Sequence, residues 1–157
     1  MLNFISKKGN LIHKTAVINW KKLAIGKNNI IGPYSVIGNF AQHPKENSNG
    51  IIEIGNNNFI NEYCNIHLPT KNKKKTQIGN NNYFMNSTTI DHDCVIENNV
   101  VLSSNVLLGG NVHIMEGAQL GMKVCVHQNQ VIGSYSMIGM NSFITKKIKV
   151  IPGYKFY

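Results

Sequence analysis

Large apolar residues recur at every sixth position through most of this chain. From residue 78 onward, thirteen consecutive positions spaced six apart are large and apolar. These positions are Ile78, Phe84, Ile90, Ile96, Leu102, Leu108, Ile114, Leu120, Val126, Ile132, Ile138, Ile144 and Val150. Shorter runs with this spacing precede them, at Ile12 and Ile18, at Ile25, Ile31 and Ile37, and at Ile54, Ile60 and Ile66. A helix repeats about every 3.6 residues and a strand every second residue, so neither element alone accounts for the pattern.

Two further features accompany the spacing. Small or β-branched residues lie four positions after the apolar residue, as at Thr88, Cys94 and Val100. Gly, Asn or Asp often follows the apolar residue directly, as at Gly109 and Gly121, and these residue types tolerate the backbone angles of tight corners. Each unit therefore predicts one short strand and one corner, and three units close a triangular coil of about eighteen residues. We predict an all-β fold, a parallel β-helix of hexapeptide repeats whose apolar residues point inward and whose coils rise by about 4.8 Å.

The length of 157 residues is typical of one domain, so we expect a single domain over 1–157. Its expected parts are an N-terminal lead-in at 1–10, coils at 11–151 and a short, loosely packed C-terminal tail at 152–157. Two interruptions of the spacing predict loops that leave the coil at about 39–53 and 68–77. Loops on a rigid scaffold often carry function, although either segment could equally be a tolerated insertion.

The composition limits partners and compartment. Lys and Arg outnumber Asp and Glu by 16 to 7, which favours an anionic partner or substrate. We expect no nucleic-acid binding, because the basic residues are not interleaved with aromatic residues on one stripe. The lysine-rich run at 71–75 is typical of a solvated loop. No stretch of about 18 apolar residues and no signal peptide is evident, so we expect no membrane span and a cytoplasmic location.

Three cysteines, Cys64, Cys94 and Cys125, form neither a disulfide framework nor a paired metal-binding motif. We interpret them as small buried residues of a protein in a reducing compartment.

Several segments carry a resemblance to a known family. They are IHKTAVI (12–18), IGPYSVIG (31–38), NEYCNIH (61–67), the stretch from Met85 to Ile114 that contains DHDC and LLGGNV, GMKVCVHQ (121–128) and IPGY (151–154). The chain resembles the left-handed parallel β-helix acyltransferases of the hexapeptide family, most of all the UDP-N-acetylglucosamine O-acyltransferases of lipid A and lipopolysaccharide synthesis. It ends before the helical C-terminal domain of those enzymes. The left hand of the coil is implied by this resemblance alone.

The spacing and the resemblance together indicate catalytic residues. His92, Gly110 and Gln128 are eighteen residues apart and each lies two residues after an inward apolar residue, so they should face outward along one edge. The resemblance implies that His92 is the general base that deprotonates the acceptor, and a histidine suits this role because its pKa lies near neutrality. It also implies that Asp93 orients the imidazole, although Asp is an ordinary corner residue as well. The backbone N–H of Gly110 would stabilise the oxyanion.

The resemblance also implies binding residues. His67, Asn111, His127 and Gln128 match positions that line the sugar cleft, with Asn111 standing where the family has His. Gly121, Met122 and Met137 match the region along which the acyl chain of the donor lies.

The implied reaction is transfer of an acyl or acetyl group from a thioester to a hydroxyl or amino group of a nucleotide-linked sugar. The donor would be acyl carrier protein or acetyl-CoA as co-substrate, with no bound cofactor and no metal. The resemblance further implies a homotrimer with active sites between subunits. Two alternatives remain open: a non-enzymatic β-helix that serves as a scaffold or binding module, and a metal hydratase similar to γ-carbonic anhydrases. The hydratase would need several histidines around zinc, and position 97, where one would be expected, is Glu97.

Overall fold

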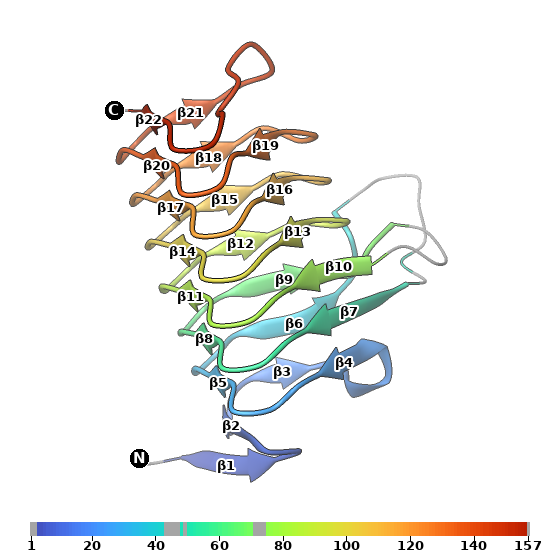
Figure 1. Cartoon of the computed structure of the whole chain (residues 1–157). Helices are drawn as coiled ribbons and strands as arrows, with labels where there is room; N and C mark the ends of the chain where they lie inside the picture. The colour runs from blue at the N-terminus through green and yellow to red at the C-terminus, as the bar shows by residue number, and fades with distance from the viewer. Residues whose placement is uncertain (1–2, 43–47, 49, 71–74, 157) are drawn as a thin grey trace.

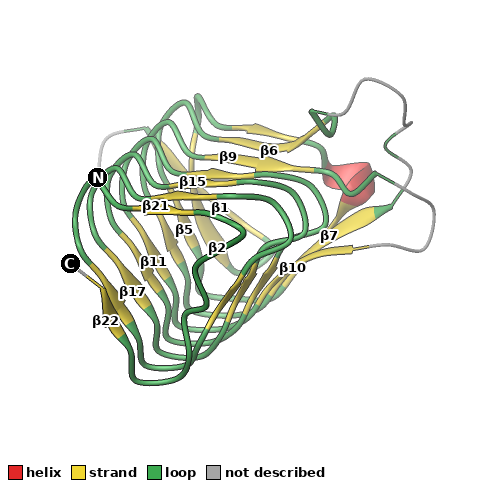
Figure 2. Ribbon diagram, turned by 90° about the horizontal axis from the view of Figure 1, so that it is seen from above, coloured by secondary structure: helices red, strands yellow, loops and turns green. Residues whose placement is uncertain are grey.

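The computed structural model describes the chain except for residues 1–2, 43–47, 49, 71–74 and 157. The described part is a prism of short strands wound into successive coils, with the two termini at opposite ends (Figure 1). Seen along its axis, the prism is triangular, and a sheet forms each side (Figure 2). The prediction of a left-handed parallel β-helix built from hexapeptide repeats is confirmed.

Three sheets contain all the strands of the described chain. The first sheet consists of β1 (Phe4–Lys7), β2 (Asn10–His13), β5 (Ile30–Ile31), β8 (Phe59–Ile60), β11 (Tyr83–Phe84), β14 (Val101–Leu102), β17 (Gln119–Leu120), β20 (Met137–Ile138) and β22 (Lys155–Phe156). The second consists of β3 (Val17–Ile18), β6 (Val36–Asn39), β9 (Asn65–His67), β12 (Thr89–Ile90), β15 (Leu107–Leu108), β18 (Cys125–Val126) and β21 (Phe143–Ile144). The third consists of β4 (Leu23–Ile25), β7 (Ile51–Ile54), β10 (Lys75–Ile78), β13 (Val95–Ile96), β16 (His113–Ile114) and β19 (Val131–Ile132).

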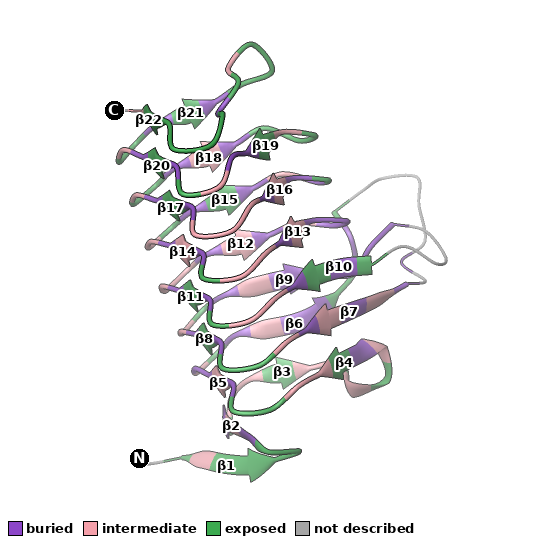
Figure 3. Ribbon diagram, viewed as in Figure 1, coloured by how far each residue is buried: buried purple, intermediate pink, exposed green. Residues whose placement is uncertain are grey.

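The register of the strands explains the spacing of the sequence. Ile90 pairs with Leu108 and Leu108 with Val126, so residues eighteen apart stack directly on one another in parallel strands. A step of six residues moves from one side of the triangle to the next, and Ile90, Ile96 and Leu102 are all buried. Figure 3 shows buried residues recurring in every coil. Burial of each such side chain stabilises the fold by about 1.5–3 kcal/mol, so the interior column is the main source of stability.

The glycines that directly follow the apolar residues have a different role from the one we predicted. Apart from Gly38, they do not have a positive φ. At most corners the left-handed residue comes three positions after the apolar residue, as at Asp93 (φ 61°) and Asn99 (φ 60°). A Cβ on Gly109 would lie 2.9 Å from the backbone nitrogen of Gln128 in the next coil. These glycines are therefore required by the close approach of successive coils, and not by the backbone angles of the corner.

The two ends of the chain are more regular than expected. β1 pairs antiparallel with β2 and extends the first sheet, and the remaining strand pairs of the described chain are parallel. In the tail, β22 pairs in parallel with β20 and continues the first sheet, while residues 152–155 are exposed. A 3₁₀ turn, η1 (Trp20–Lys22), lies between β3 and β4. No helix in the described residues has the length and apolarity needed to cross a membrane.

Candidate active site

Both interruptions of the spacing occur at the same corner of the prism, where the chain passes from the second sheet to the third (Figure 2). They are shorter than predicted, since β6 extends to Asn39, β7 begins at Ile51 and β10 begins at Lys75. The interruptions therefore lie between Asn39 and Ile51 and between His67 and Lys75. The lysine-rich run at 71–75 falls mostly outside the described residues. One coil after the second loop, the same corner is formed by the residues that follow β12, among them the DHD sequence at 91–93.

His92 and Gly110 stack at this corner as the spacing predicted. A Cβ built on Gly110 would overlap the imidazole of His92, so only glycine leaves room for the ring. Although His92 lies outside the apolar core, the residue is only 7% exposed. The ring lies against Gly110 on one side and beside buried Asp93 on the other, and it is shielded from water even in the single chain. Gln128, one coil further along the edge, is exposed.

The side chain of Asp93 connects His92 to the second loop. Asp93 Oδ2 lies 2.8 Å from Nδ1 of His92 and accepts a hydrogen bond of 2.7 Å from the hydroxyl of Thr70. If Nδ1 donates to this carboxylate, which when ionised can only accept, the lone pair of the imidazole is left on Nε2. The Asp93 N–H donates to Thr76 Oγ1 at 3.1 Å, and the Thr76 hydroxyl donates to the carbonyl of His67 at 3.0 Å. The two threonines at either end of the loop thus position the His92–Asp93 pair.

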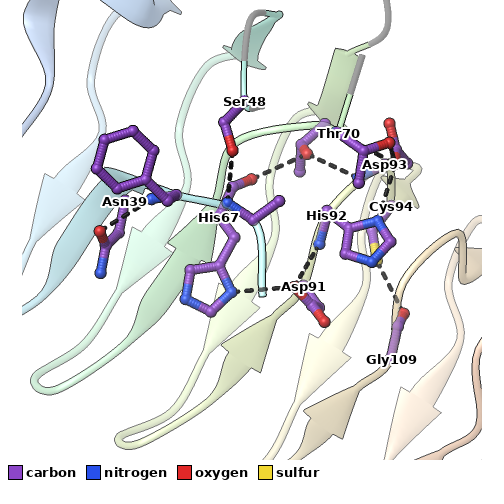
Figure 4. Close-up of polar contacts among 12 residues, drawn as sticks. Asn39, Ser48, His67, Thr70, Asp91, His92, Asp93, Cys94 and Gly109 are labelled. Carbon is purple, nitrogen blue, oxygen red and sulfur yellow. Dashed lines mark hydrogen bonds and ion pairs between the residues drawn. The ribbon is translucent and has the colours of Figure 1, made fainter. Parts of the chain in front are cut away.

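A second histidine and carboxylate pair lies beside the first. His67 Nδ1 is 3.1 Å from Oδ1 of Asp91, and the same oxygen accepts a hydrogen bond of 2.8 Å from the backbone N–H of His92. Figure 4 shows Asp91 between the two histidines and Thr70 beside Asp93. Burial opposes ionisation of Asp91, but the hydrogen bonds from His67 and from the His92 N–H outweigh it and hold the pKa of this carboxyl below its usual value.

A groove of about 420 Å³ runs along the second sheet next to this corner. Its floor consists of the outward-facing residues of successive strands, which are Thr89, Leu107, Cys125 and Phe143. Asp91, Gly109 and His127 line the groove on the side of the corner, and Gln42 of the first loop also contacts it. The groove is mainly apolar and has polar groups at one side, a lining typical of sites that bind small molecules.

Gly110 also presents a backbone donor. Among the described residues, no hydrogen-bond acceptor is found for the Gly110 N–H, although the N–H groups of its neighbours Gly109 and Asn111 bind Val126 and His92 carbonyls at 2.9 Å. An N–H group without a partner beside the general-base candidate is suited to bind a developing oxyanion. The N–H of Asn111 holds the backbone of His92, while its own side chain is exposed.

Known proteins show the same features of fold and sequence. The model of the bacterial transferase hexapeptide family (six repeats) matches residues 75–110. The acyl-[acyl-carrier-protein]–UDP-N-acetylglucosamine O-acyltransferase of Synechocystis is 36% identical over 125 residues, which are 79% of this chain and 45% of the relative. The solved UDP-N-acetylglucosamine acyltransferase of Bacteroides fragilis superposes with a TM-score of 0.84 at 33% identity and covers 87% of this chain and 54% of that one.

The structure of the UDP-N-acetylglucosamine O-acyltransferase of Moraxella catarrhalis gives a TM-score of 0.69 at 33% identity, and the match covers 86% of this chain and 67% of that one. The chain belongs to the hexapeptide-repeat acyltransferase family. It spans less than half of the length of the curated relative from Synechocystis.

Within this acyltransferase fold, the expected donor-binding residues do not lie beside His92. Gly121 and Met122 follow β17 of the first sheet, and Met137 lies on β20 of that sheet. His92 follows β12 of the second sheet, so the two groups lie on different parts of the same prism. His127 and Gln128 do lie at the His92 corner, but both are exposed, and the His127 ring lies 3.1 Å from the Gln128 carbonyl oxygen.

Three residues of this corner were not predicted from the sequence. Asp91 directly precedes His92, and the alternation of acid, histidine and acid was a signal that we did not use. Thr70 and Thr76 lie within the predicted second loop, where the hexapeptide spacing is lost and nothing in the sequence indicates their partners. In the described residues, no three His, Cys, Asp or Glu side chains gather in an arrangement that would hold a metal ion.

Proposed function

We propose that this protein transfers an acyl or acetyl group from a thioester to a hydroxyl or amino group of a nucleotide-linked sugar. The observation that carries the proposal is the chain of contacts from Thr70 through Asp93 to His92. The His92 ring stacks on Gly110, and an apolar groove lies next to this corner. The relatives support the same class of substrates, since both are named UDP-N-acetylglucosamine O-acyltransferases and the Synechocystis protein is named with acyl-[acyl-carrier-protein] as donor.

The residues of the corner account for each step. His92 Nε2 takes the proton from the acceptor hydroxyl as its oxygen attacks the thioester carbonyl carbon. The negative charge that develops on the carbonyl oxygen is stabilised by the Gly110 N–H. The carbon–sulfur bond then breaks, and the departing thiolate receives the proton from His92. Asp93 holds the ring in the required tautomer and stabilises the imidazolium between these steps.

The donor is acyl carrier protein or acetyl-CoA, and the net positive charge suits either anionic donor. Formal charge is +9, and all seven acidic residues lie between positions 46 and 116, so both ends of the prism are basic. The protein itself holds no prosthetic group in this mechanism. His67, Asn111, His127 and Gln128 would contact the sugar nucleotide.

The separation of the donor-binding candidates from His92 supports a homotrimer. Three triangular prisms related by cyclic symmetry would place the first-sheet corner with Met122 and Met137 of one subunit against the His92 corner of the next. In that arrangement each active site is shared, and a single chain provides only half of it.

Mass-spectrometric product detection tests the reaction. The protein is mixed with a panel of nucleotide sugars, hydroxy and amino, and with acetyl-CoA or loaded acyl carrier protein. We expect a mass gain of one acyl group, a loss of about 10²–10⁴-fold in rate for His92→Ala, and little change for His113→Ala. His113 is the matched control because it lies on the third sheet and is paired with Glu97 at 2.7 Å. Absence of product with every donor and acceptor would favour the scaffold alternative, and a product that His92→Ala still forms at the wild-type rate would remove His92 as the base.

Complementation tests the shared site. His92→Ala and Met137→Arg should each be inactive, and when they are co-expressed about a quarter of the interfaces would join an intact His92 corner to an intact Met137 corner. We expect the mixed trimers to recover about a quarter of the wild-type activity. Two inactive variants that stay inactive in a mixed trimer would show that the site lies within one chain.

A further inference from the structure

Asp91 is the acidic residue that lines the groove. Its carboxylate lies one residue before His92, at the corner, while Leu107 and Phe143 make the adjoining wall apolar. Its side chain is 19% exposed, so part of the carboxylate reaches the groove and the rest is covered by protein. The part of the carboxylate that is covered by protein needs hydrogen-bond partners within the protein, and the part that is accessible can bind water or a ligand.

The two oxygens of Asp91 differ in what they contact. Oδ1 is held from two sides, by His67 Nδ1 at 3.1 Å and by the His92 N–H at 2.8 Å. Among the described residues, Oδ2 receives no hydrogen bond. A carboxylate can accept about four hydrogen bonds, so its fixed half orients the side chain and its other half remains able to accept.

We propose that Asp91 Oδ2 accepts a hydrogen bond from a hydroxyl or N–H group of the acceptor that neighbours the group being acylated. The inference rests on the proposed acyl transfer. It adds the requirement that the acceptor carry two adjacent donors, one for His92 and one for Asp91. The sequence adjacency of the two residues places their side chains at the same corner, and a sugar ring presents donors on neighbouring carbons.

The chemistry of the carboxylate makes this contact selective. The hydrogen bonds from His67 and His92 keep Asp91 ionised at neutral pH, and an ionised carboxylate accepts but does not donate. An ether or carbonyl oxygen at the neighbouring position would meet a carboxylate oxygen with no proton between them. Acceptors with a hydroxyl or N–H there are therefore favoured over deoxy or O-alkylated analogues.

The matched variant is Asp91→Asn. Its amide oxygen can keep the contacts of Oδ1, while the NH₂ group replaces Oδ2 and turns an acceptor into a donor. Using the nucleotide sugar that the wild type acylates, with UDP-N-acetylglucosamine tested first, we expect the KM for the acceptor to rise about 10- to 100-fold. The value of kcat should fall much less than in His92→Ala. His113→Gln, on the remote third sheet, serves as the control.

Deoxy analogues of the same nucleotide sugar separate substrate contact from a structural role. With the wild type, one analogue that lacks a single hydroxyl should lose about 10- to 100-fold in kcat/KM, and Asp91→Asn should add little further loss with that analogue. Additive losses with every analogue would overturn the proposal and leave Asp91 as a support for His67 and His92. A wild type that forms no product would refute the acyl transfer itself, whereas product formation with an unchanged KM in Asp91→Asn would refute only this inference.

Discussion

At the scale of single residues, the position of the His92 ring is fixed by the space and the hydrogen bonds that its neighbours provide. Gly110 offers space, because any Cβ there would occupy the volume of the imidazole. Thr70 offers a hydroxyl that binds Asp93 at 2.7 Å, and Asp93 in turn lies 2.8 Å from the ring. Each contact restricts the position of one ring, and a general base works only when it is held within a fraction of an ångström of its proton donor.

Gly110→Ala should displace His92 without breaking the coil, because Gly110 does not have a positive φ. We expect kcat to fall by about 100-fold, since a displacement of about 1 Å can cost that much. The measurement is a double-mutant cycle with His92→Ala. The Gly110→Ala loss should vanish in the His92→Ala background, and a loss that persists there would mean that the methyl group acts on substrate or on the fold.

The stability contributed by Asp91 should depend on pH in a defined direction. Its pKa is lower in the folded chain than the unfolded value of about 3.9. The contribution is therefore fully present above about pH 4 and is lost as the pH falls through the lower, folded pKa. Urea unfolding of the wild type and of Asp91→Asn over this range tests it. We expect the gap in unfolding free energy to shrink on acidification, and a gap that widens would contradict the assigned direction.

At the scale of elements, each two-residue strand presents one residue to the core and one to solvent. On β18, Val126 is buried and Cys125 lines the groove. Buried asparagine side chains also link the coils. Asn29 Nδ2 donates to Asn10 Oδ1 at 2.8 Å, and Asn58 Nδ2 donates to Asn29 Oδ1 at 2.9 Å. This ladder stacks through successive N-terminal coils, and hydrogen bonds between like side chains replace apolar contacts there.

Thiol labelling should distinguish the three cysteines by the element that holds them. Burial raises the pKa of the Cys64 and Cys94 thiols to about 12, so both stay protonated and unreactive at neutral pH. Cys125 is half-buried in the groove. We expect an aromatic disulfide reagent to label one thiol per native chain and all three after denaturation. Cys125→Ser should abolish native labelling, and rapid labelling of a second native thiol would show that a coil is open.

At the scale of the whole molecule, the prism is a stack in which each coil contacts mainly its two neighbours. Stability is then a sum over repeats and their interfaces. The interior column runs from Ile12 to Val150, with Phe84 as the largest of its fully buried side chains. The outer faces of the prism carry the groove, the corners and the surfaces that a neighbouring subunit would cover in the proposed trimer.

A pair of variants on β17 tests this division. Leu120 is 1% exposed, and Leu120→Ala should lower the free energy of unfolding by about 2–5 kcal/mol. Gln119 precedes it on the same strand and is exposed, so Gln119→Ala should change stability by no more than about 0.5 kcal/mol. Chemical denaturation of both variants gives the comparison. Equal effects would contradict the assignment of inward and outward positions.

The sequence by itself determined the coil, because one side chain in six must fill a column whose register repeats every eighteen residues. The same arithmetic placed His92 over Gly110. It did not determine what surrounds them, since the contacts of Thr70, Thr76 and Asp91 join different coils, and two of these residues lie where the repeat is interrupted. Nor did it reveal that the glycines after the apolar residues are required by close approach of the coils. Only the tertiary structure brought the second loop against Asp93, buried His92 and gave hydrogen bonds to one oxygen of Asp91 and, among the described residues, none to the other, because these contacts depend on the path of a loop that no periodicity describes.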